Sequence, residues 1–446
     1  MMIRSTNTAL LLLLSSLLLS FSTLANVNPT LGKALAEPLI TDDAEQLFTS
    51  QPSVMPELAK SGKYTVGVIT DQIVNTTAFD HTDFDGTYER PLTIELWYPA
   101  EENINGNRAT YKAVTRLHKP FELLGSAYRD IAPLSQGNFP FVVLSHGYTG
   151  DRTIMFYLAE HLASHGYVVA SIDHTDSTTK EIDIVNAATA GFVSTLLHRS
   201  RDQQFVLAHY RQQQSEISKI ANFKRAGVIG YSMGGYGAIN TVGGCYDVTP
   251  ASLKALGFNE QQAKALAPAF NFCNAGEEKP DTSWQAMVAF APWGQELNLH
   301  SAAALSKLAV PSLYVAGDQD DISGYEYGVK KLFQQTSAQD NYLLVYNNAR
   351  HNIAPHPAPK IAYQDDIDLG HYFEPSWSSE QLTRFNRHFV LAFLDCHLKK
   401  VKCEYLPTTK SSTQKKLDRE TYSEAWPGIP HRWATGIEFY RAQSAK

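Results

Sequence analysis

Long apolar runs are absent from this sequence beyond residue 25, so no later segment has the roughly 20 consecutive apolar residues of a membrane-spanning helix. Charged residues make up only 19% of the chain, and they form no long block of one sign. Because nucleic-acid-binding proteins gather positive charge on one face, we expect no nucleic-acid partner. The net charge of -7 favours solubility and indicates no particular partner.

The first 25 residues have the pattern of a secretory signal peptide. Arg4 supplies a positive charge, and Ala9 to Leu19 form an apolar core that is too short to span a bilayer comfortably. Small side chains at Thr23 and Ala25 suit a signal peptidase, which predicts cleavage after Ala25. No cysteine follows the core, so no lipid anchor is expected there. We expect an exported, periplasmic or secreted protein, with an uncleaved anchor as the alternative.

Cysteine is scarce, with 4 residues in the chain. None of them forms the CxxC pair that is typical of zinc sites, so no metal is expected there. An even number of cysteines in an exported chain favours disulfide bonds. Four cysteines allow three pairings. We choose the local one, which encloses the least chain: Cys245 with Cys273, and Cys396 with Cys403.

Apolar segments alternate with helical patterns through most of the chain. Continuous apolar runs predict buried strands at 139–145, 167–173, 226–231, 286–291, 312–316 and 342–346. Helices are expected between these strands, and a last helix at 379–398. This alternation predicts an α/β fold with a mostly parallel, doubly wound sheet that is covered by helices on both faces.

The expected organisation is a signal peptide at 1–25, an N-terminal arm at 26–61, a catalytic domain at 62–400 and a C-terminal extension at 401–446. Strands at 64–73 and 92–98 are expected to pair at the start of the domain. Two segments interrupt the alternation, and we interpret both as insertions. The first, at 99–138, is polar and irregular. The second, at 243–284, contains two cysteines and is either a lid or a surface decoration.

The strongest local motif is Gly230-Tyr231-Ser232-Met233-Gly234. It ends an expected strand and begins an expected helix, which is the structural context of a nucleophile elbow. Small residues let strand and helix approach, while the turn strains the serine and places it at a helix N-terminus that favours negative charge. The motif predicts Ser232 as a nucleophile, and the alternative is a helix-capping serine in a tight turn.

A serine hydroxyl needs a base that takes its proton. His351 follows the expected strand at 342–346 after a short polar loop, and it lies C-terminal to the serine and to the acid candidates. This is the chain order Ser, Asp, His of one class of serine hydrolase. We therefore predict His351 as the base, with His356 as its competitor.

Three aspartates follow the expected strand at 312–316, and one of them should orient the imidazole. Asp318 comes directly after Gly317, close to the strand end. Asp321 precedes an apolar residue and is expected to face solvent or to cap the next helix. We predict Asp320 as the acid and keep Asp318 as the first alternative.

An oxyanion hole needs two backbone N–H donors. One is expected at Met233, directly after the nucleophile, and the other in the loop His146 to Gly150, where we propose Tyr148. We interpret His146 as a structural hydrogen-bonding residue of this turn and not as a base.

Taken together, these motifs resemble those of the α/β-hydrolase superfamily, and in particular the bacterial enzymes grouped with dienelactone hydrolases, platelet-activating-factor acetylhydrolases and cutinase-like polyester hydrolases. The resemblance covers roughly 64–398 and implies the α/β-hydrolase fold. It rests on Arg90-Pro91-Leu92, Trp97-Tyr98-Pro99, His146 to Gly150, Gly230 to Gly235, Pro292-Trp293, Gly317 to Ile322 and Ala349 to His351. It also implies that Asp320 is the acid and that Trp293, beside Tyr148, contacts the substrate; a core aromatic is the alternative for Trp293.

We therefore expect a monomeric serine hydrolase that cleaves small-molecule or lipid carboxylic esters through an acyl-enzyme on Ser232, without metal or cofactor. The same mechanism also suits a platelet-activating-factor-like lipid or a polyester. A catalytically silent binding protein of this fold is an alternative from another class. A cation-binding protein is a further alternative, with the candidate ligands His351, His356, Asp365, Asp366, Asp368 and His371.

Overall fold

The structure is a computed structural model, and it describes residues 44–48, 55–102, 106–273, 281–401, 403–407, 410–411, 426–430 and 433–442. The expected signal peptide and most of the N-terminal arm lie outside the described residues. Within the arm, Glu45 forms a bridge with Leu123 of the sheet. In the part of the chain that is described, no helix is long and apolar enough to cross a membrane.

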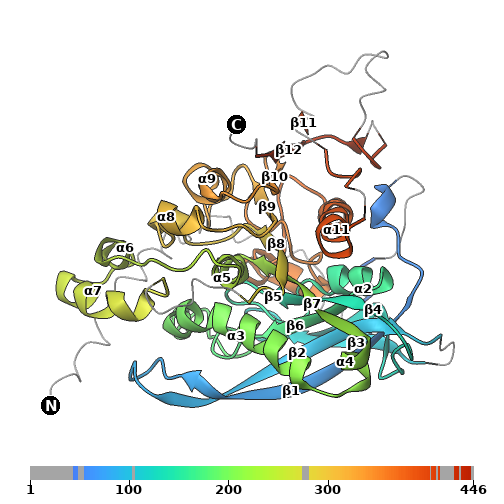
Figure 1. Ribbon diagram of the computed structural model, residues 1–446, viewed down its shortest axis with the longest axis horizontal. Coiled ribbons are helices and arrows are strands. Elements are labelled where there is room, and N and C mark those ends of the chain that lie inside the picture. The colour runs from blue at the N-terminus through green and yellow to red at the C-terminus, as the bar shows by residue number, and fades with distance from the viewer. Residues whose placement is uncertain are drawn as a thin grey trace.

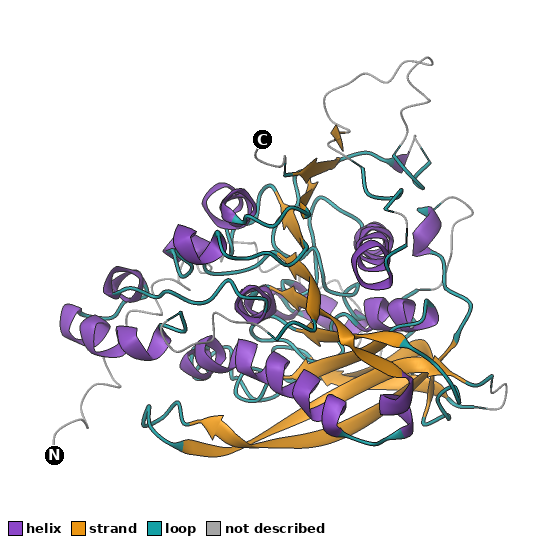
Figure 2. Ribbon diagram, viewed as in Figure 1, coloured by secondary structure: helices purple, strands orange, loops and turns teal. Residues whose placement is uncertain are grey.

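The described strands form one 12-stranded sheet in the order β11-β12-β10-β9-β8-β7-β5-β6-β2-β1-β4-β3 (Figures 1 and 2). Its centre is parallel and consists of β5 (Phe139–Ser145), β6 (Val168–Asp173), β7 (Ala221–Tyr231), β8 (Trp284–Phe290), β9 (Ser312–Gly317) and β10 (Asn341–Tyr346). Every residue of β9 and β10 is buried, which explains their unbroken apolar runs. The expected α/β class is therefore confirmed.

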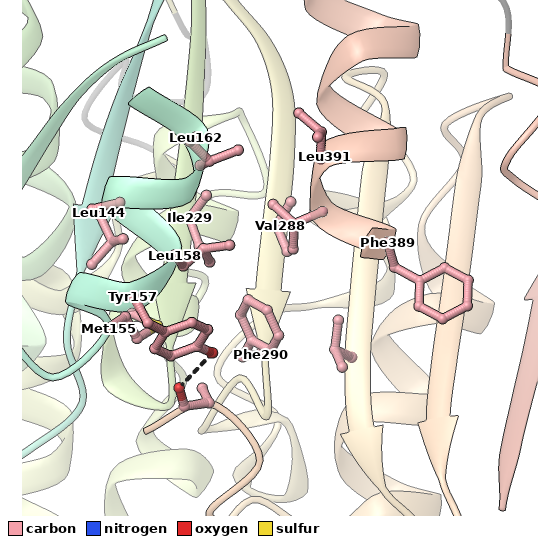
Figure 3. Close-up of a cluster of buried hydrophobic side chains, with 14 of the residues drawn as sticks. Leu144, Met155, Tyr157, Leu158, Leu162, Ile229, Val288, Phe290, Phe389 and Leu391 are labelled. Carbon is pink, nitrogen blue, oxygen red and sulfur yellow. Dashed lines mark hydrogen bonds between the residues drawn. The ribbon is translucent and has the colours of Figure 1, made fainter. Parts of the chain in front are cut away.

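Helices cover both faces of this sheet. On one face α2 (Phe156–Ser164) and α11 (Ser379–Leu394) pack against the central strands, and Figure 3 shows Leu158 and Leu162 of α2 beside Ile229 and Val288. The other face is covered by α3 (Phe192–Gln212), α5 (Met233–Thr241) and α9 (Lys330–Gln335). The two apolar clusters lie on opposite faces of the sheet and hold the strand ends in fixed positions.

The first half of the chain extends the sheet further than expected. Strands β1 (Thr65–Phe79) and β2 (Thr87–Ala100) form a long antiparallel pair. The expectation that 99–138 is irregular was wrong, because it contains β3 (Arg108–Val114) and β4 (Pro120–Arg129). These strands pair with each other, and β4 also pairs with β1. Buried and exposed residues alternate along them, which is the pattern of strands with one solvated face.

The second insertion is helical in its described part. It contains α6 (Pro250–Ala255) and α7 (Glu260–Leu266), which pack on an apolar cluster beside α5. Both expected disulfides are present. Cys245–Cys273 closes this insertion, and Cys396–Cys403 ties η7 (Asp395–Lys399), which follows α11, to the next part of the chain.

The C-terminal extension supplies the other edge of the sheet. Strand β12 (Ile437–Arg441) pairs antiparallel with β10, and β11 (Lys410–Ser411) pairs with β12. The remaining helical segments are η2 (Glu57–Ala59), α4 (Glu216–Ile220), η3 (Ala267–Phe270), η4 (Gln295–Leu297), α8 (Ala302–Leu305), η5 (Tyr325–Val329), η6 (Lys360–Gln364), α10 (Asp366–Leu369) and η7 (Asp395–Lys399).

Candidate active site

Ser232 stands at the junction of β7 and α5, with the backbone angles φ 53° and ψ -115°. A non-glycine residue with positive φ is strained, and such strain is typical of functional turns. The space around the turn requires the adjacent glycines. A Cβ on Gly230 would lie 2.1 Å from the carbonyl oxygen of Gly234, and one on Gly234 would lie 2.1 Å from that of Ser145. The turn therefore has the geometry of a nucleophile elbow.

His351 and Asp320 form a hydrogen-bonded pair at the ends of neighbouring strands. Nδ1 of His351 lies 3.0 Å from Oδ1 and 3.1 Å from Oδ2 of Asp320. The carboxylate also accepts the backbone N–H groups of Ile322 and Ser323. Burial raises the pKa of Asp320, but the charge and hydrogen bond of His351 outweigh it, and the pKa is held below its usual value. Asp320 is therefore a carboxylate that fixes the orientation of the imidazole.

The two other aspartates of this loop have different partners. Asp318 accepts the N–H of Asn348 at 2.6 Å, and burial raises its pKa. Asp321 is largely exposed and pairs with Arg350 at 2.7 Å. Only Asp320 of the three contacts His351 among the described residues.

The loop after β5 approaches the nucleophile closely. A Cβ on Gly147 would lie 3.1 Å from the Cβ of Ser232, so the absence of a side chain allows this approach. Among the described residues, the N–H groups of Tyr148 and Met233 have no acceptor. The hydroxyl of Tyr148 donates to the carbonyl of Ala188 at 2.8 Å, which fixes its side chain. The loop and the start of α5 thus bring two unused backbone donors beside Ser232.

A second Ser-His-Asp arrangement lies beneath this loop, and the sequence did not reveal it. Nε2 of His174 lies 2.7 Å from Oγ of Ser145, and Nδ1 lies 2.9 Å from Oδ2 of Asp202. Arg90 donates to both oxygens of Asp202, at 2.9 and 3.0 Å. None of the four side chains is more than 1% exposed, so no ester can reach them.

This buried network supports the loop at 146–150. The N–H of His174 donates to Nε2 of His146, and Nδ1 of His146 lies 2.6 Å from the carbonyl of Gly147. Burial, with the nearby charge of Arg199, holds the pKa of both histidines well below the usual value. Both rings are therefore neutral, and His146 has the structural role that the sequence indicated.

Aromatic side chains line one side of the nucleophile. The ring of Trp293 lies 5.4 Å from that of Phe192, and the ring of Phe192 lies 5.9 Å from that of Tyr148. The N–H of Trp293 donates to the carbonyl of Ser232 at 3.2 Å, which fixes this wall beside the elbow. The three rings form an apolar surface that is joined to the turn at Ser232 through the backbone of Trp293.

The groups around His351 are mostly polar. The ring of Tyr231 lies 5.2 Å from the ring of His351, and its hydroxyl lies 3.2 Å from Oδ1 of Asn352. His356, the competing base, is fully buried and contacts the carbonyl of Pro357 through Nδ1. In the part of the chain that is described, no three His, Cys, Asp or Glu residues gather to hold a metal ion. The candidate cation ligands around residues 351–371 therefore do not form such a site.

The chain is similar to several known proteins. Residues 54–225 match the family described as platelet-activating factor acetylhydrolase, isoform II. Platelet-activating factor acetylhydrolase of Cavia porcellus is 35% identical over 125 residues, which cover 26% of this chain and 28% of that protein. The chain thus aligns with less than a third of that relative.

A longer alignment links the chain to bis(hydroxyethyl) terephthalate hydrolase of Streptomyces coelicolor. The two are 24% identical over 316 residues, or 70% of this chain and 74% of that protein. The solved structure of a ferulic acid esterase from Streptomyces cinnamoneus superimposes with a TM-score of 0.53 at 16% identity, and covers 90% of this chain and 100% of that one. This likeness establishes the fold.

The fold and the elbow define an α/β-hydrolase. Within that superfamily the chain is similar to the ester hydrolases named above.

Proposed function

We propose that the protein hydrolyses carboxylic esters through an acyl-enzyme on Ser232. The observation that carries this proposal is the strained serine at the β7–α5 turn, together with the His351–Asp320 pair. Ester hydrolysis also agrees with the enzymes named above. A binding protein without catalytic activity would need neither the strained serine nor the His351–Asp320 pair.

The mechanism follows from the placement of these groups. Oγ of Ser232 attacks the ester carbonyl while Nε2 of His351 accepts its proton. Asp320 holds Nδ1 and stabilises the imidazolium that forms. The N–H groups of Met233 and Tyr148 bind the oxyanion, and each such donor is worth about 2.7–4 kcal/mol in the transition state. His351 then protonates the leaving alkoxide, and water releases the acyl group by the same steps.

The aromatic wall is proposed to hold the acyl group. Tyr148, Phe192 and Trp293 present an apolar surface beside Ser232. Ser232 is 5% exposed and His351 is 9% exposed, so only a small part of either residue is accessible to an ester. We therefore favour small-molecule or lipid esters over a polyester, which needs an open groove.

A fluorophosphonate probe tests the nucleophile directly. It should label Ser232 in the wild type, and Ser232→Ala should lose both labelling and ester hydrolysis. A Ser232→Ala protein that turns over esters at the wild-type rate would contradict the mechanism. A series of 4-nitrophenyl esters of rising acyl length, compared with a polyester film, then tests the preference for small esters.

We also propose that the protein works outside the cytoplasm as a monomer. Support comes from the signal-peptide pattern of the first 25 residues and from the two disulfides, which persist in oxidising compartments. Fractionation of the producing cells and the N-terminal sequence of the mature protein test export. Sedimentation equilibrium tests the oligomeric state.

A further inference from the structure

Tyr231 and Asn352 each adjoin one of the proposed catalytic residues in the chain. Tyr231 is the last residue of β7 and precedes Ser232, and Asn352 follows His351 in the loop after β10. The hydroxyl of Tyr231 donates to Oδ1 of Asn352 at 3.2 Å, and it lies 3.4 Å from the carbonyl oxygen of His351. A side chain of the nucleophile turn therefore contacts both the backbone of the base and the residue next to it.

The side-chain amide of Asn352 is held in one orientation. Its Nδ2 donates to the carbonyl oxygens of Gly370 at 2.8 Å and Phe373 at 3.0 Å, so both amide protons are used. Oδ1 is the acceptor that remains, and it receives the hydroxyl of Tyr231. The segment 370–373 thus fixes the acceptor on which this hydroxyl depends.

Tyr231 is also fixed, because its strand lies in the centre of the sheet between β5 and β8. The residue is 4% exposed, and the N–H of the following Ser232 donates to the carbonyl of Phe290 at 2.9 Å. Burial raises the pKa of the Tyr231 hydroxyl, and the charge of Asp320 raises it further. The hydroxyl therefore keeps its proton and remains a donor at neutral pH.

The ring of Tyr231 lies beside the imidazole of His351. The two ring centres are 5.2 Å apart, with 34° between the planes. Asp320 holds Nδ1 of the same imidazole at 3.0 Å. A general base acts only when its nitrogen lies within hydrogen-bond reach of the proton that it takes, so contacts that fix this ring bear on the rate of proton transfer.

Other hydrogen bonds hold the histidine loop independently of Tyr231. Nδ2 of Asn386 donates to the carbonyl of Ile353 at 2.8 Å, and the N–H of Ile353 donates to the carbonyl of His351 at 2.9 Å. Loss of the Tyr231 hydroxyl should therefore shift the imidazole without unfolding the loop.

We propose that Tyr231 and Asn352 are positioning residues, which hold the imidazole of His351 in place for proton transfer with Ser232. Their hydrogen bond links the strand that ends at the nucleophile to the loop that carries the base. This proposal rests on the proposed function and gives a role in it to two side chains that act through His351.

Tyr231→Phe tests the hydroxyl, because it keeps the ring. From the usual net strength of one hydrogen bond, we expect kcat/KM to fall about 2- to 10-fold. The loss should be larger for ethyl acetate than for 4-nitrophenyl acetate, since an alkoxide must be protonated as it leaves and 4-nitrophenolate leaves without a proton. A smaller fraction of folded enzyme would lower both values equally. An equal loss on the two esters, or no loss on either, therefore overturns the proposal.

Tyr210→Phe is the matched control. Tyr210 is also buried, and its hydroxyl lies 3.0 Å from Oδ2 of Asp71, where α3 packs near β1. The substitution removes a buried hydrogen bond outside the catalytic loops. It should leave kcat/KM unaffected for both esters.

Asn352→Ala tests the partner and should lower kcat/KM at least as much, since it removes the acceptor of Tyr231 and both contacts to segment 370–373. Residues that act through one contact show coupled effects. The variant with both substitutions, Tyr231→Phe and Asn352→Ala, should therefore lose less than the product of the two single losses. Losses that multiply would show that the side chains act independently and would overturn the pair.

The rate at which a fluorophosphonate labels Ser232 separates this proposal from the proposed function, because labelling needs an activated serine but no ester turnover. Tyr231→Phe should lower this rate, and Tyr210→Phe should not. If the wild type hydrolyses no ester, the proposed function fails, but a labelling rate that depends on Tyr231 still supports the positioning role. A labelling rate that is unchanged by Tyr231→Phe overturns it.

Discussion

The imidazole of His351 is held by Asp320, whose two oxygens lie 3.0 and 3.1 Å from Nδ1. We expect Asp320→Asn to fold and to lower kcat by as much as about 10⁴, the effect of the same change in a serine protease, because the amide favours the wrong imidazole tautomer. Steady-state kinetics on a 4-nitrophenyl ester, with circular dichroism as the folding check, measures this loss.

The neighbouring aspartates supply matched controls. Asp318→Asn and Asp321→Asn should keep most of the activity, since Asp318 accepts the N–H of Asn348 and Asp321 pairs with Arg350. If Asp318→Asn loses activity and Asp320→Asn keeps it, the catalytic acid is Asp318 and not Asp320.

Strands with two buried faces could be predicted from the sequence, and strands with one buried face could not. Every residue of β9 is buried, so its apolar run is continuous and easy to recognise. In β3 only Ala109 and Tyr111 are buried, and in β12 only Ile437 and Phe439. Such short alternation is hard to distinguish from a polar loop.

The candidate site could also be predicted from the sequence only in part. The motif around Ser232 carries its own geometry, because a sharp strand-to-helix turn needs glycine at fixed positions. The network of Ser145, His174 and Asp202 carries no local signal, since its members are far apart in the chain and only packing brings them together.

The buried network is expected to be structural. Asp202→Ala would leave Arg90 and His174 without their shared acceptor, and breaking a buried ion pair costs about 3–5 kcal/mol of unfolding free energy. Asp281→Ala, which breaks a partly exposed pair with Arg211, should cost about 0.2–1 kcal/mol. Urea unfolding of the three proteins measures the difference.

Kinetics then decides which serine reacts. Ser145→Ala should retain ester hydrolysis in the folded protein, whereas Ser232→Ala should lose it. The reverse result would assign catalysis to the buried network.

The two disulfides should differ in their contribution to stability. The entropy of loop closure gives about 3–4 kcal/mol for Cys245–Cys273, with a sequence separation of 28, and about 2–3 kcal/mol for Cys396–Cys403, with a separation of 7. Paired Cys→Ala variants should therefore lower the Tm more at the first bridge. Peptide mapping without reductant should recover both bridges, and four free thiols in protein from an oxidising compartment would contradict the pairing.

Buried neutral histidines should make the fold sensitive to mild acid. Burial is the largest cause that holds the pKa of His146, His161, His174 and His371 well below the usual value, so these rings stay neutral in the folded protein. The unfolded chain binds protons below its ordinary histidine pKa of about 6.5. The unfolded state then holds more protons than the folded state, and stability falls as the pH falls. Each such histidine removes about 1.4 kcal/mol per pH unit below that value.

Urea unfolding at several pH values between 8 and 5 tests this expectation, with a stability that is nearly constant above pH 7 and falls steeply below about pH 6.5. His161→Gln should reduce the slope of the unfolding free energy against pH by the contribution of one proton. His161 lies in α2, and its Nε2 has no partner among the described residues. The substitution also changes the packing, and the cost of that change does not depend on pH. It is measured at pH 8, where His161 is neutral in both the folded and the unfolded protein. A slope that the substitution leaves unchanged would show that His161 binds a proton in the folded protein, and a stability that stays constant down to pH 5 would contradict the expectation for all four rings.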